Sequence, residues 1–342
     1  MNILGIETSC DDTAAAVIRD GSVVLSNVVS SQTYMHERYG GIIPEICSRE
    51  HLTTMVPVVN EALALSELKP SEIDGIAVTH GPGLAGSLLV GVNAAKGFAM
   101  AWDKPLIGIN HLEGHIYSAW LEDLFEKSGT EFPLVCLIAS GGHTELVLMK
   151  GHLDYELLAK TRDDAAGEAF DKVARVLRLG FPGGPEIQKE AEKTDHHIDP
   201  FPRPVIRGSL DFSFSGLKTA VVRRAEDDGF YPIQDDNGPS ESVVRNYALA
   251  FQNAIVDCLV SRTLKAVDMY DGKGILIGGG VAANTELRKT LSRKSRVPVV
   301  APRPGLCTDN GAMIGAAAYY RFKECGSTEW DMDAIPGLSL AD

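Results

Sequence analysis

The order of the predicted strands and helices repeats once along the chain, and this repeat restricts the folds that the sequence can adopt. Each half begins with a hairpin of two strands and a third strand, followed by alternating helices and strands. Hairpin strands pair antiparallel, whereas strands connected through helices pair in parallel. We therefore predict an α/β protein of two lobes, each a mixed sheet with helices on both faces.

Hydrophobic periodicity and turn residues set the predicted boundaries. In the first half, we expect strands at 2–7, 13–19, 23–29, 73–79 and 105–109 and helices at 44–67 and 85–102. In the second half, we expect strands at 133–139, 144–149, 154–160, 274–277 and 297–301 and helices at about 165–179, 184–194, 241–271, 283–295 and 309–323. The predicted lobes are 1–105 and 106–308, with the last helix (about 309–325) packing back on the first lobe, an irregular insertion at about 195–240 and a tail at 326–342.

The composition excludes several classes of protein. The 342 residues include 46 acidic and 32 basic side chains, a net charge of −14, which argues against a chain that binds nucleic acid by itself. No apolar stretch is long enough to cross a bilayer, and the N-terminus lacks the basic residues of a signal peptide. The six cysteines include no C-x-x-C pair, so we expect reduced thiols and a cytoplasmic location.

Two histidines lie four residues apart, directly after the predicted strand 105–109. On a helix, positions i and i+4 share one face, so the rings of His111 and His115 can reach one metal ion. The spacing is similar to the zinc-protease pattern H-E-x-x-H, but Glu113 follows His111 by two residues, about 200° round a helix. Glu113 therefore cannot face the metal as a protease base does. Two ordinary polar histidines remain the alternative.

Asp309 is the candidate third ligand. It lies on the loop after the last predicted strand, and open α/β sheets bind their ligands at the carboxyl ends of strands. Two histidines and one carboxylate would leave coordination positions open for a substrate. The structural alternative is that Asp309 caps the N-terminus of the last helix.

Three turns are suited to a phosphate-bearing ligand. The turn at 8–13 offers hydroxyls, backbone amides and the carboxylates of Asp11 and Asp12, which can hold a cation or act as a base. The turn at 140–144 has the same place in the second repeat, and its two glycines let backbone amides approach a ligand. The segment 278–284 follows a strand and opens a helix, where free amides bind anions. Capped hairpin turns remain the alternative for the first two.

Two further segments have open interpretations. The segment 211–219 mixes aromatic residues, hydroxyls and Lys218, and either covers a cleft or forms a hydrophobic plug between helices. The basic residues between 288 and 296 either form a solvated helix face or make weak contacts with a nucleic-acid backbone.

Taken together, these motifs closely resemble one family, the tRNA threonylcarbamoyladenosine transferases of the bacterial TsaD type, formerly misnamed glycoprotein endopeptidases. The matching stretches cover nearly the whole chain in the family's order. They are 5–13, 40–45, 81–84, 111–115, 140–144, 165–172, 182–185, 211–219, 278–284 and 307–312. The chain departs from the family where Asp12 replaces the usual Glu and where 186–188 follows neither common subfamily pattern.

The resemblance implies a two-lobed fold of the actin, Hsp70 and sugar-kinase type, a duplicated RNase H-like fold with a central nucleotide cleft. It implies transfer of a threonylcarbamoyl group from threonylcarbamoyl-AMP to N6 of adenosine 37 in tRNAs that read codons starting with A. One divalent metal, iron or zinc, would be held by His111, His115 and Asp309. The adenylate, or ATP or ADP in its place, would bind at Ile138, Ala139, Ser140, Gly141, Gly142, Asp171, Gly184 and Asn284.

The family's partners are implied as well. Besides tRNA, they are a paralogous subunit of the same fold (TsaB type) and a small ATPase (TsaE type), while a separate enzyme makes the adenylate. Homodimerisation is left open, and no membrane partner is expected. Because the chain is acidic, we expect it to bind tRNA weakly unless partner subunits supply a basic surface. The helix at 44–67 is a candidate partner surface, with burial in the first lobe as the alternative.

The chemistry of the implied reaction assigns further roles. The donor is a mixed anhydride with a good leaving group, so the site must orient it, stabilise charge on the carbamoyl oxygen and remove a proton from the adenosine amine. Asp11 is the candidate base, and His143 is its rival. Two rival classes are a kinase on the same fold, which would need a catalytic Asp and not the histidine pair, and a non-catalytic scaffold paralogue, which would have lost the pair.

Overall fold

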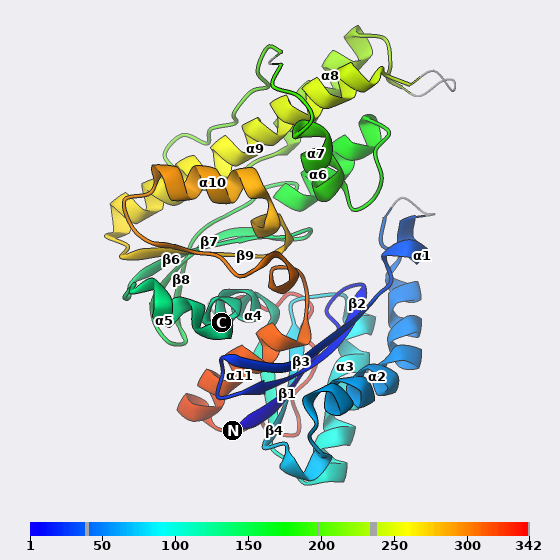
Figure 1. The fold of residues 1–342 in the computed structure, drawn as a ribbon, viewed down its shortest axis with the longest axis vertical. Coiled ribbons are helices and arrows are strands. Elements are labelled where there is room, and N and C mark those ends of the chain that lie inside the picture. Colours follow the sequence, from blue (N-terminus) through cyan, green and yellow to red (C-terminus); the bar gives the residue numbers. More distant parts are fainter. Residues whose placement is uncertain (38–40, 197, 233–237, 341–342) are drawn as a thin grey trace. The chain divides into compact units, whose positions relative to one another are not determined.

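The computed structural model describes residues 1–37, 41–196, 198–232 and 238–340, and the chain divides into two compact units (Figure 1). Unit 1 comprises Met1–Thr130, Lys150–Tyr155 and Pro302–Asp342. Unit 2 comprises Glu131–Met149 and Glu156–Ala301. Each unit contains one five-stranded mixed sheet, as the repeat in the sequence predicts.

The sheet of unit 1 has the strand order β3-β2-β1-β4-β5. Strand β2 (Asp12–Arg19) pairs antiparallel with β1 (Asn2–Glu7) on one side and with β3 (Val23–Ser31) on the other. Strand β4 (Gly75–Gly81) pairs in parallel with β1, and β5 (Leu106–Asn110) pairs in parallel with β4. The carboxyl ends of β1, β4 and β5 therefore meet at one edge of the sheet.

Helices cover both faces of this sheet. Helices α2 (Pro44–Ser66) and α3 (Ala85–Trp102) pack on the face to which Leu4 and Ile6 contribute core side chains. Helix α11 (Gly311–Cys325) packs against β1 and β2 on the opposite face. The shorter elements of the unit are α1 (Thr33–Glu37), η1 (Pro70–Glu72), α4 (His111–Tyr117), η2 (Ser118–Asp123), α5 (Leu124–Ser128) and η4 (Pro304–Leu306).

The boundary of unit 1 differs from the predicted end of the first lobe at residue 105. Residues 106–130 belong to unit 1, because β5 pairs with β4 while α4 and η2 pack against α11. Sequence periodicity does not reveal this boundary, since the helix against which α4 packs comes almost 200 residues later.

The sheet of unit 2 repeats the same plan with the order β10-β9-β6-β7-β8. Strands β6 (Leu134–Ala139) and β7 (Thr144–Gly151) form the antiparallel hairpin, and β8 (Asp154–Lys160) lies at its outer edge. Strands β9 (Gly274–Gly278) and β10 (Val299–Val300) continue the sheet in parallel beyond β6. The predicted repeat is therefore confirmed in its strand order.

The helices of unit 2 include one that the sequence prediction missed. The segment 195–240 was expected to be irregular, but it contains α8 (Ser215–Asp227), on which Leu217, Val221 and Ala225 are buried at every fourth position. Residues 197 and 233–237 of that segment lie outside the described residues. The other helices are α6 (Ala166–Val176), α7 (Gly183–Ala191), α9 (Glu241–Tyr270), η3 (Gly280–Ala283) and α10 (Thr285–Lys294).

The tail that follows α11 is ordered against unit 1 as far as residue 340. The amide of Thr328 donates to the carbonyl of Leu106 at 2.7 Å, beside the free edge of β5. Further along, the amide of Ile335 donates to the carbonyl of His80 at 2.7 Å. Near its end, the carbonyl of Ser339 accepts from the side-chain amide of Asn110 at 3.1 Å. The tail therefore reaches the residue at which β5 ends and α4 begins.

The longest helix is α9, with 30 residues, and the next is α2, with 23. Charged side chains interrupt both of them. Within the described part of the chain, no helix is both long and apolar enough to cross a membrane.

Candidate functional site

Helix α4 carries both histidines and begins directly after β5. Its N-cap is Asn110, whose Oδ1 accepts a hydrogen bond from the amide of Leu112 at 2.9 Å. All seven residues of the helix are buried. The rings of His111 and His115 lie one turn apart, with centroids separated by 4.7 Å in an edge-on arrangement. The spacing therefore places both rings together, as the sequence predicts.

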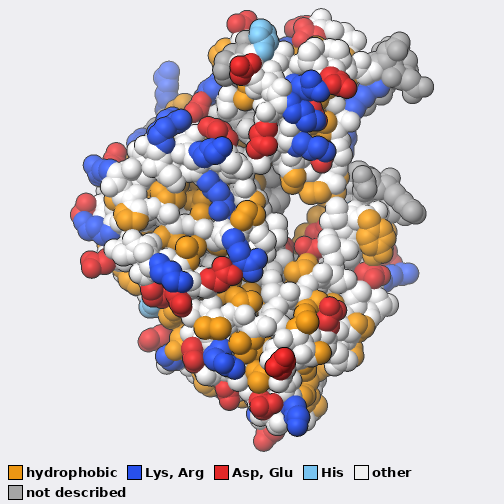
Figure 2. Space-filling view, in the orientation of Figure 1, with side chains coloured by type: hydrophobic (Ala, Val, Ile, Leu, Met, Phe, Trp, Pro, Cys, Tyr) orange, Lys and Arg blue, Asp and Glu red, His pale blue; other side chains and the backbone are white. Residues whose placement is uncertain are grey.

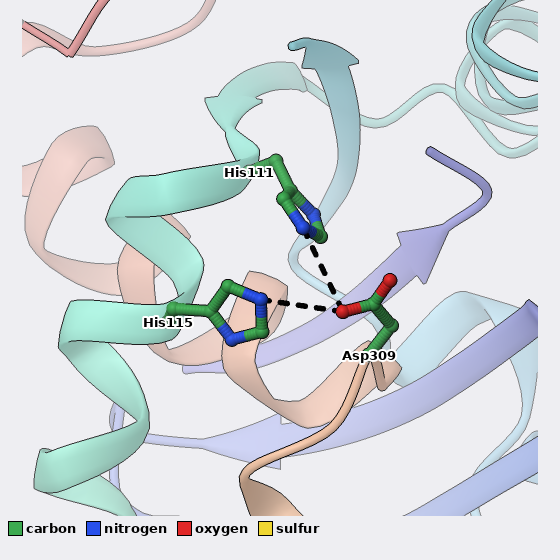
Figure 3. A group of neighbouring side chains, drawn as sticks. All are labelled: His111, His115 and Asp309. Atoms are coloured by element: carbon green, nitrogen blue, oxygen red, sulfur yellow. Dashed lines mark ion pairs between the residues drawn. The ribbon is translucent and has the colours of Figure 1, made fainter. Parts of the chain in front are cut away.

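Asp309 reaches the two rings from the segment that precedes α11. Its Oδ1 lies 3.2 Å from Nε2 of His115 and 3.6 Å from Nε2 of His111 (Figure 3). The cap of α11 is Asn310, whose Oδ1 accepts from the amide of Met313 at 3.0 Å, so the alternative of Asp309 as the helix cap is wrong. One potential ligand atom from each of the three residues lies within 4.8 Å of the others.

Close packing of α4 on α11 holds the three side chains together. A Cβ atom at Gly114 would lie 2.8 Å from the Cδ1 atom of Ile314, so the glycine permits the close approach of the two helices. One residue earlier, Glu113 is fully buried and accepts hydrogen bonds from Arg321 of α11 at 2.8 and 3.1 Å. Tyr155 also donates to Glu113, at 3.1 Å. Glu113 is thus engaged away from the histidines, as its position on the helix predicts.

The electrostatics of this cluster favour a positive charge. Burial acts to lower the pKa of His111, but the carboxylates of Asp309 and Glu7 outweigh burial and raise it to about 9. His115 is 1% exposed, and its Nε2, which lies 3.2 Å from Asp309, makes no hydrogen bond among the described residues. Buried polar atoms normally have partners, so this nitrogen fits a bound cation. Two imidazole nitrogens and a carboxylate oxygen suit iron or zinc.

Glu7 is a neighbour of this cluster to which sequence reasoning gave no role. It ends β1 and is fully buried, with Oε2 at 3.1 Å from Nδ1 of His111. Burial acts to raise the pKa of Glu7, but the charge and hydrogen bond of His111 lower it below its usual range. The available signal in the sequence was an acidic residue at the end of an otherwise apolar strand.

The first turn predicted to bind phosphate, at 8–13, also lies beside the histidines. The hydroxyl of Ser9 is 3.1 Å from Nδ1 of His111. The backbone carbonyl of Ser9 accepts a hydrogen bond from the amide of Leu84 at 2.8 Å. Burial raises the pKa of Asp12 to about 7, against a hydrogen bond from Ser31 and with a contribution from Asp11. Asp11 and Asp12 thus belong to an acidic segment on the same unit as the three candidate ligands.

The second turn predicted to bind phosphate, at 140–143, joins β6 to β7 in unit 2. The amide of Ser140 donates to the carbonyl of His143 at 2.8 Å, and the amide of His143 donates to the Ser140 hydroxyl at 3.2 Å. Gly141 and Gly142 between them have open space where a side chain would be. The amide of Gly167, in the first turn of α6, donates to the Ser140 carbonyl at 3.1 Å. The turn is therefore tied to the start of α6.

The glycine segment after β9 lies directly beside this turn. Strands β6 and β9 are parallel neighbours, and Ile138 pairs with Gly278. Gly279 has φ of +89°, which favours glycine, and a Cβ there would lie 2.4 Å from the carbonyl oxygen of Ala139. The structure thus brings Ile138, Ala139 and the third predicted turn to one edge of the sheet.

The remaining predicted nucleotide residues lie at helix ends of the same unit. Asp171 of α6 accepts a hydrogen bond from the amide of Gly183 at 2.7 Å, which fixes the start of α7 where Gly184 lies. Asn284 caps α10 through the amide of Leu287 at 3.0 Å and donates to Gln252 at 2.9 Å. The side chain of Asn284 therefore already has two structural partners.

Comparison with known proteins assigns the family. The model of the family described as TsaD, tRNA N6-adenosine threonylcarbamoyltransferase, matches residues 23–316. The chain belongs to this transferase family. Proteins named tRNA N6-adenosine threonylcarbamoyltransferase are 53% identical in Thermomicrobium roseum (99% of this chain, 97% of that protein) and 46% identical in Bacillus subtilis (99% and 96%). The resemblance drawn from the motifs is confirmed.

Solved structures of other proteins have a fold similar to that of this chain. HypF of T. kodakarensis superposes with a TM-score of 0.60 at 15% identity, covering 94% of this chain and 48% of that chain. Component A of the (R)-2-hydroxyglutaryl-CoA dehydratase of Acidaminococcus fermentans superposes with 0.54 at 14% identity, covering 94% and 98%. With the duplicated sheet order, these likenesses confirm the actin, Hsp70 and sugar-kinase type of fold.

Proposed function

We propose that this protein transfers the threonylcarbamoyl group of threonylcarbamoyl-AMP to N6 of adenosine 37 in tRNAs that read codons starting with A. Family membership over nearly the full chain supports the reaction. The observation that carries the site is the convergence of His111, His115 and Asp309 from two distant parts of the sequence. Neither a kinase nor a scaffold requires this cluster.

The proposed cofactor is one divalent metal, iron or zinc, held by His111, His115 and Asp309. The raised pKa of His111 and the buried Nε2 of His115 support a cation at this position. With three protein ligands, positions stay open for substrate. Such an ion supplies a Lewis acid for the carbamoyl oxygen of the donor.

The proposed adenylate site belongs to unit 2. The amides of Gly141 and Gly142 and the N-termini of α7 and α10 can donate to phosphate oxygens and ribose hydroxyls. Asp171 and Gly184 lie at the junction of α6 and α7, where the nucleoside is proposed to bind. ATP or ADP would occupy the same place. Asn284, which caps α10, is also proposed to contact the nucleoside.

Asp11 is the proposed base that removes the proton from the adenosine amine, with His143 as its rival. Both lie in the paired hairpin turns of the two repeats. Removing a general base costs a factor of about 100 to 10,000 in rate. Asp11→Ala and His143→Ala are therefore compared with purified adenylate and tRNA. A wild-type rate for Asp11→Ala would exclude Asp11 as the base.

The proposed partners are tRNA, a paralogous subunit of the same fold and a small ATPase. For the paralogue we propose the exposed apolar side chains of α2 as the contact. Leu52 and Val56 lie one turn apart and are 67% and 54% exposed, whereas the other apolar side of α2 is buried in the core. The cytoplasm is the proposed location, because the tRNA substrates are there.

Mass spectrometry of tRNA nucleosides tests the proposed reaction. The protein and its partner subunits are incubated with threonylcarbamoyl-AMP and unmodified tRNA, and the tRNA is then digested. Threonylcarbamoyladenosine is expected with wild-type protein and not with His111→Ala. A kinase would instead consume ATP without modifying tRNA. The absence of the modified nucleoside above a control without enzyme would refute the proposed function.

A further inference from the structure

The carboxylate of Glu7 is held in a fixed position by three contacts within unit 1. Thr79 of the neighbouring strand β4 donates its hydroxyl to Oε2 at 2.5 Å, and the amide of Ser9 donates to Oε1. The third contact joins Oε2 to Nδ1 of His111 at 3.1 Å. Since Glu7 and Thr79 end adjacent parallel strands, the sheet itself sets the position of this carboxylate.

Unit 1 offers a direct comparison between Glu7 and a second buried glutamate, Glu113. Both side chains are fully buried. Glu113 is paired with Arg321, a permanent cation, at 2.8 Å. Among the described residues, the ion pair that Glu7 forms is with His111. Burying a carboxylate is costly unless a cation is near, so Glu7 requires the positive charge of the histidine cluster itself.

We propose that Glu7 is a positioning residue of the metal centre, which selects the ring tautomer of His111 and aims its Nε2 at the ion. This inference rests on the proposed metal centre. A carboxylate only accepts hydrogen bonds, so the ring proton of neutral His111 is on Nδ1 and the Nε2 lone pair is free. That Nε2 is the atom that faces Asp309, at 3.6 Å.

Ser9 alone does not determine this tautomer. Its hydroxyl is also 3.1 Å from Nδ1 of His111, but a hydroxyl can either donate or accept. With Nδ1 unprotonated, its lone pair would face the Oε2 atom of Glu7 at 3.1 Å, which is repulsive. Glu7 therefore decides the direction of the hydrogen bond. Its negative charge, added to that of Asp309, also balances a divalent ion.

Metal affinity of the full-length protein tests the proposal. Metal-free wild type, Glu7→Gln and the matched control Glu113→Gln are titrated with Zn²⁺ in competition with a chelator of known affinity. Loss of an outer partner of a metal-binding histidine weakens binding by about 10- to 100-fold, which is the effect expected for Glu7→Gln. Glu113→Gln is expected to keep wild-type Zn²⁺ affinity, because Glu113 faces Arg321.

Thermal unfolding of the metal-free proteins separates positioning from a structural role. Glu7→Gln breaks the buried pair with His111, but the ring of His111 can then lose its proton, so Tm is expected to fall less than in Glu113→Gln. Glu113→Gln leaves Arg321 unpaired and is expected to lower Tm. A Tm for Glu7→Gln as low as that of Glu113→Gln, together with wild-type Zn²⁺ affinity, would overturn the proposal.

A second variant keeps the test decisive if Glu7→Gln does not fold. Thr79→Val preserves the carboxylate of Glu7 but removes the hydroxyl that orients it. We expect it to weaken Zn²⁺ binding by about three- to tenfold. Unchanged affinity in Thr79→Val would also count against the proposal. Asp309→Ala serves as the reference for the centre: if it binds Zn²⁺ like wild type, the metal centre itself is refuted, whereas failure of Glu7→Gln alone refutes only the role of Glu7.

Discussion

The two units contain the same number of acidic residues but very different numbers of basic ones. Unit 1 has 23 acidic and 11 basic side chains, and unit 2 has 23 and 21. Unit 1 therefore carries −12 of the net charge of −14. In unit 2, Lys and Arg stand among the acids, and Figure 2 shows blue side chains grouped over helices α7 to α10.

One carboxyl from each unit illustrates this difference. In unit 2, burial acts to raise the pKa of Asp164, but hydrogen bonds and charges from Lys172 and Lys218 lower it. In unit 1, burial raises the pKa of Asp12 to about 7, and its acidic neighbours add to the rise. Burial and acidic neighbours thus raise the pKa of Asp12 in unit 1, whereas two lysines pair with Asp164 in unit 2. We therefore expect the metal-dependent chemistry on unit 1 and the contacts with an RNA backbone on unit 2.

Asp309→Ala has the largest expected effect, because it breaks the cluster of unit 1 alone. Loss of this ligand is expected to remove the metal and to reduce transfer by about a thousandfold or more. Binding of ADP, which we assign to unit 2, is expected to stay within about twofold of wild type. Metal analysis and calorimetry measure the two quantities separately. Glu61→Ala, which removes an exposed acid of α2, is the charge-matched control. Loss of ADP binding in Asp309→Ala would show that the units do not act separately.

The reciprocal variant is Gly142→Val in unit 2. Open space surrounds this glycine, so the fold should tolerate a side chain, while a phosphate should not. We expect ADP affinity to fall by about 10- to 100-fold, with unchanged Zn²⁺ binding and Tm. Gly279→Ala is the contrasting control. Its φ of +89° and its approach to the carbonyl of Ala139 should cost about 1–3 kcal/mol of stability. A large drop in Tm for Gly142→Val would contradict a ligand-specific role.

Local pattern in the sequence predicted most of this fold. Alternating and helical periodicity located both hairpins, the parallel strands and the long helices to within a few residues. Helix α8 was missed because its three buried positions lie in a segment rich in Pro, Gly and Asp. The end of unit 1 was misplaced because it depends on packing of α4 against α11, which no local pattern encodes.

The candidate site divides in the same way. The spacing of His111 and His115 was sufficient to pair them, because four residues make one helical turn. Asp309 was a candidate ligand only because it follows a predicted strand. The alternative, that Asp309 caps the last helix, is wrong because Asn310 is the cap. Glu7 could not be assigned, because its partner His111 is 104 residues away and the contact exists only in the folded sheet.

The pH dependence of stability sharpens the comparison of the acids. A carboxyl whose pKa is raised to about 7 in the folded state stabilises the fold below its unfolded pKa of about 4, and this contribution is lost as the pH rises through 7. Asp12→Asn is therefore expected to match wild type near pH 4 and to be more stable by about 1–3 kcal/mol at pH 8.

Asp164→Asn in unit 2 is expected to have the opposite effect on stability. Its lowered pKa contributes stability above the unfolded value, so the variant should be less stable at pH 7 and approach wild type as the pH falls below about 4. Urea unfolding of the metal-free proteins from pH 3 to 8 measures both differences. If the two variants shifted stability in the same direction at pH 8, the electrostatic contrast between the units would be wrong.

The smallest expected effect concerns tRNA. Lys289 and Lys294 are exposed on α10, and Nζ of Lys294 lies 3.8 Å from a carboxylate oxygen of Asp257. If they face phosphates, replacing both with Ala should reduce the salt dependence of tRNA binding by about one to two units of slope and weaken affinity a few-fold at low salt.

The matched pair in unit 1 is Lys127 and Lys323, and Lys127 lies 3.9 Å from Asp123. Both double variants remove two positive charges, so a general effect of net charge would shift tRNA binding equally in each. A change confined to the α10 variant, measured by fluorescence anisotropy in the full complex, would assign the RNA contact to unit 2, because only local phosphate contacts depend on where the charge is removed.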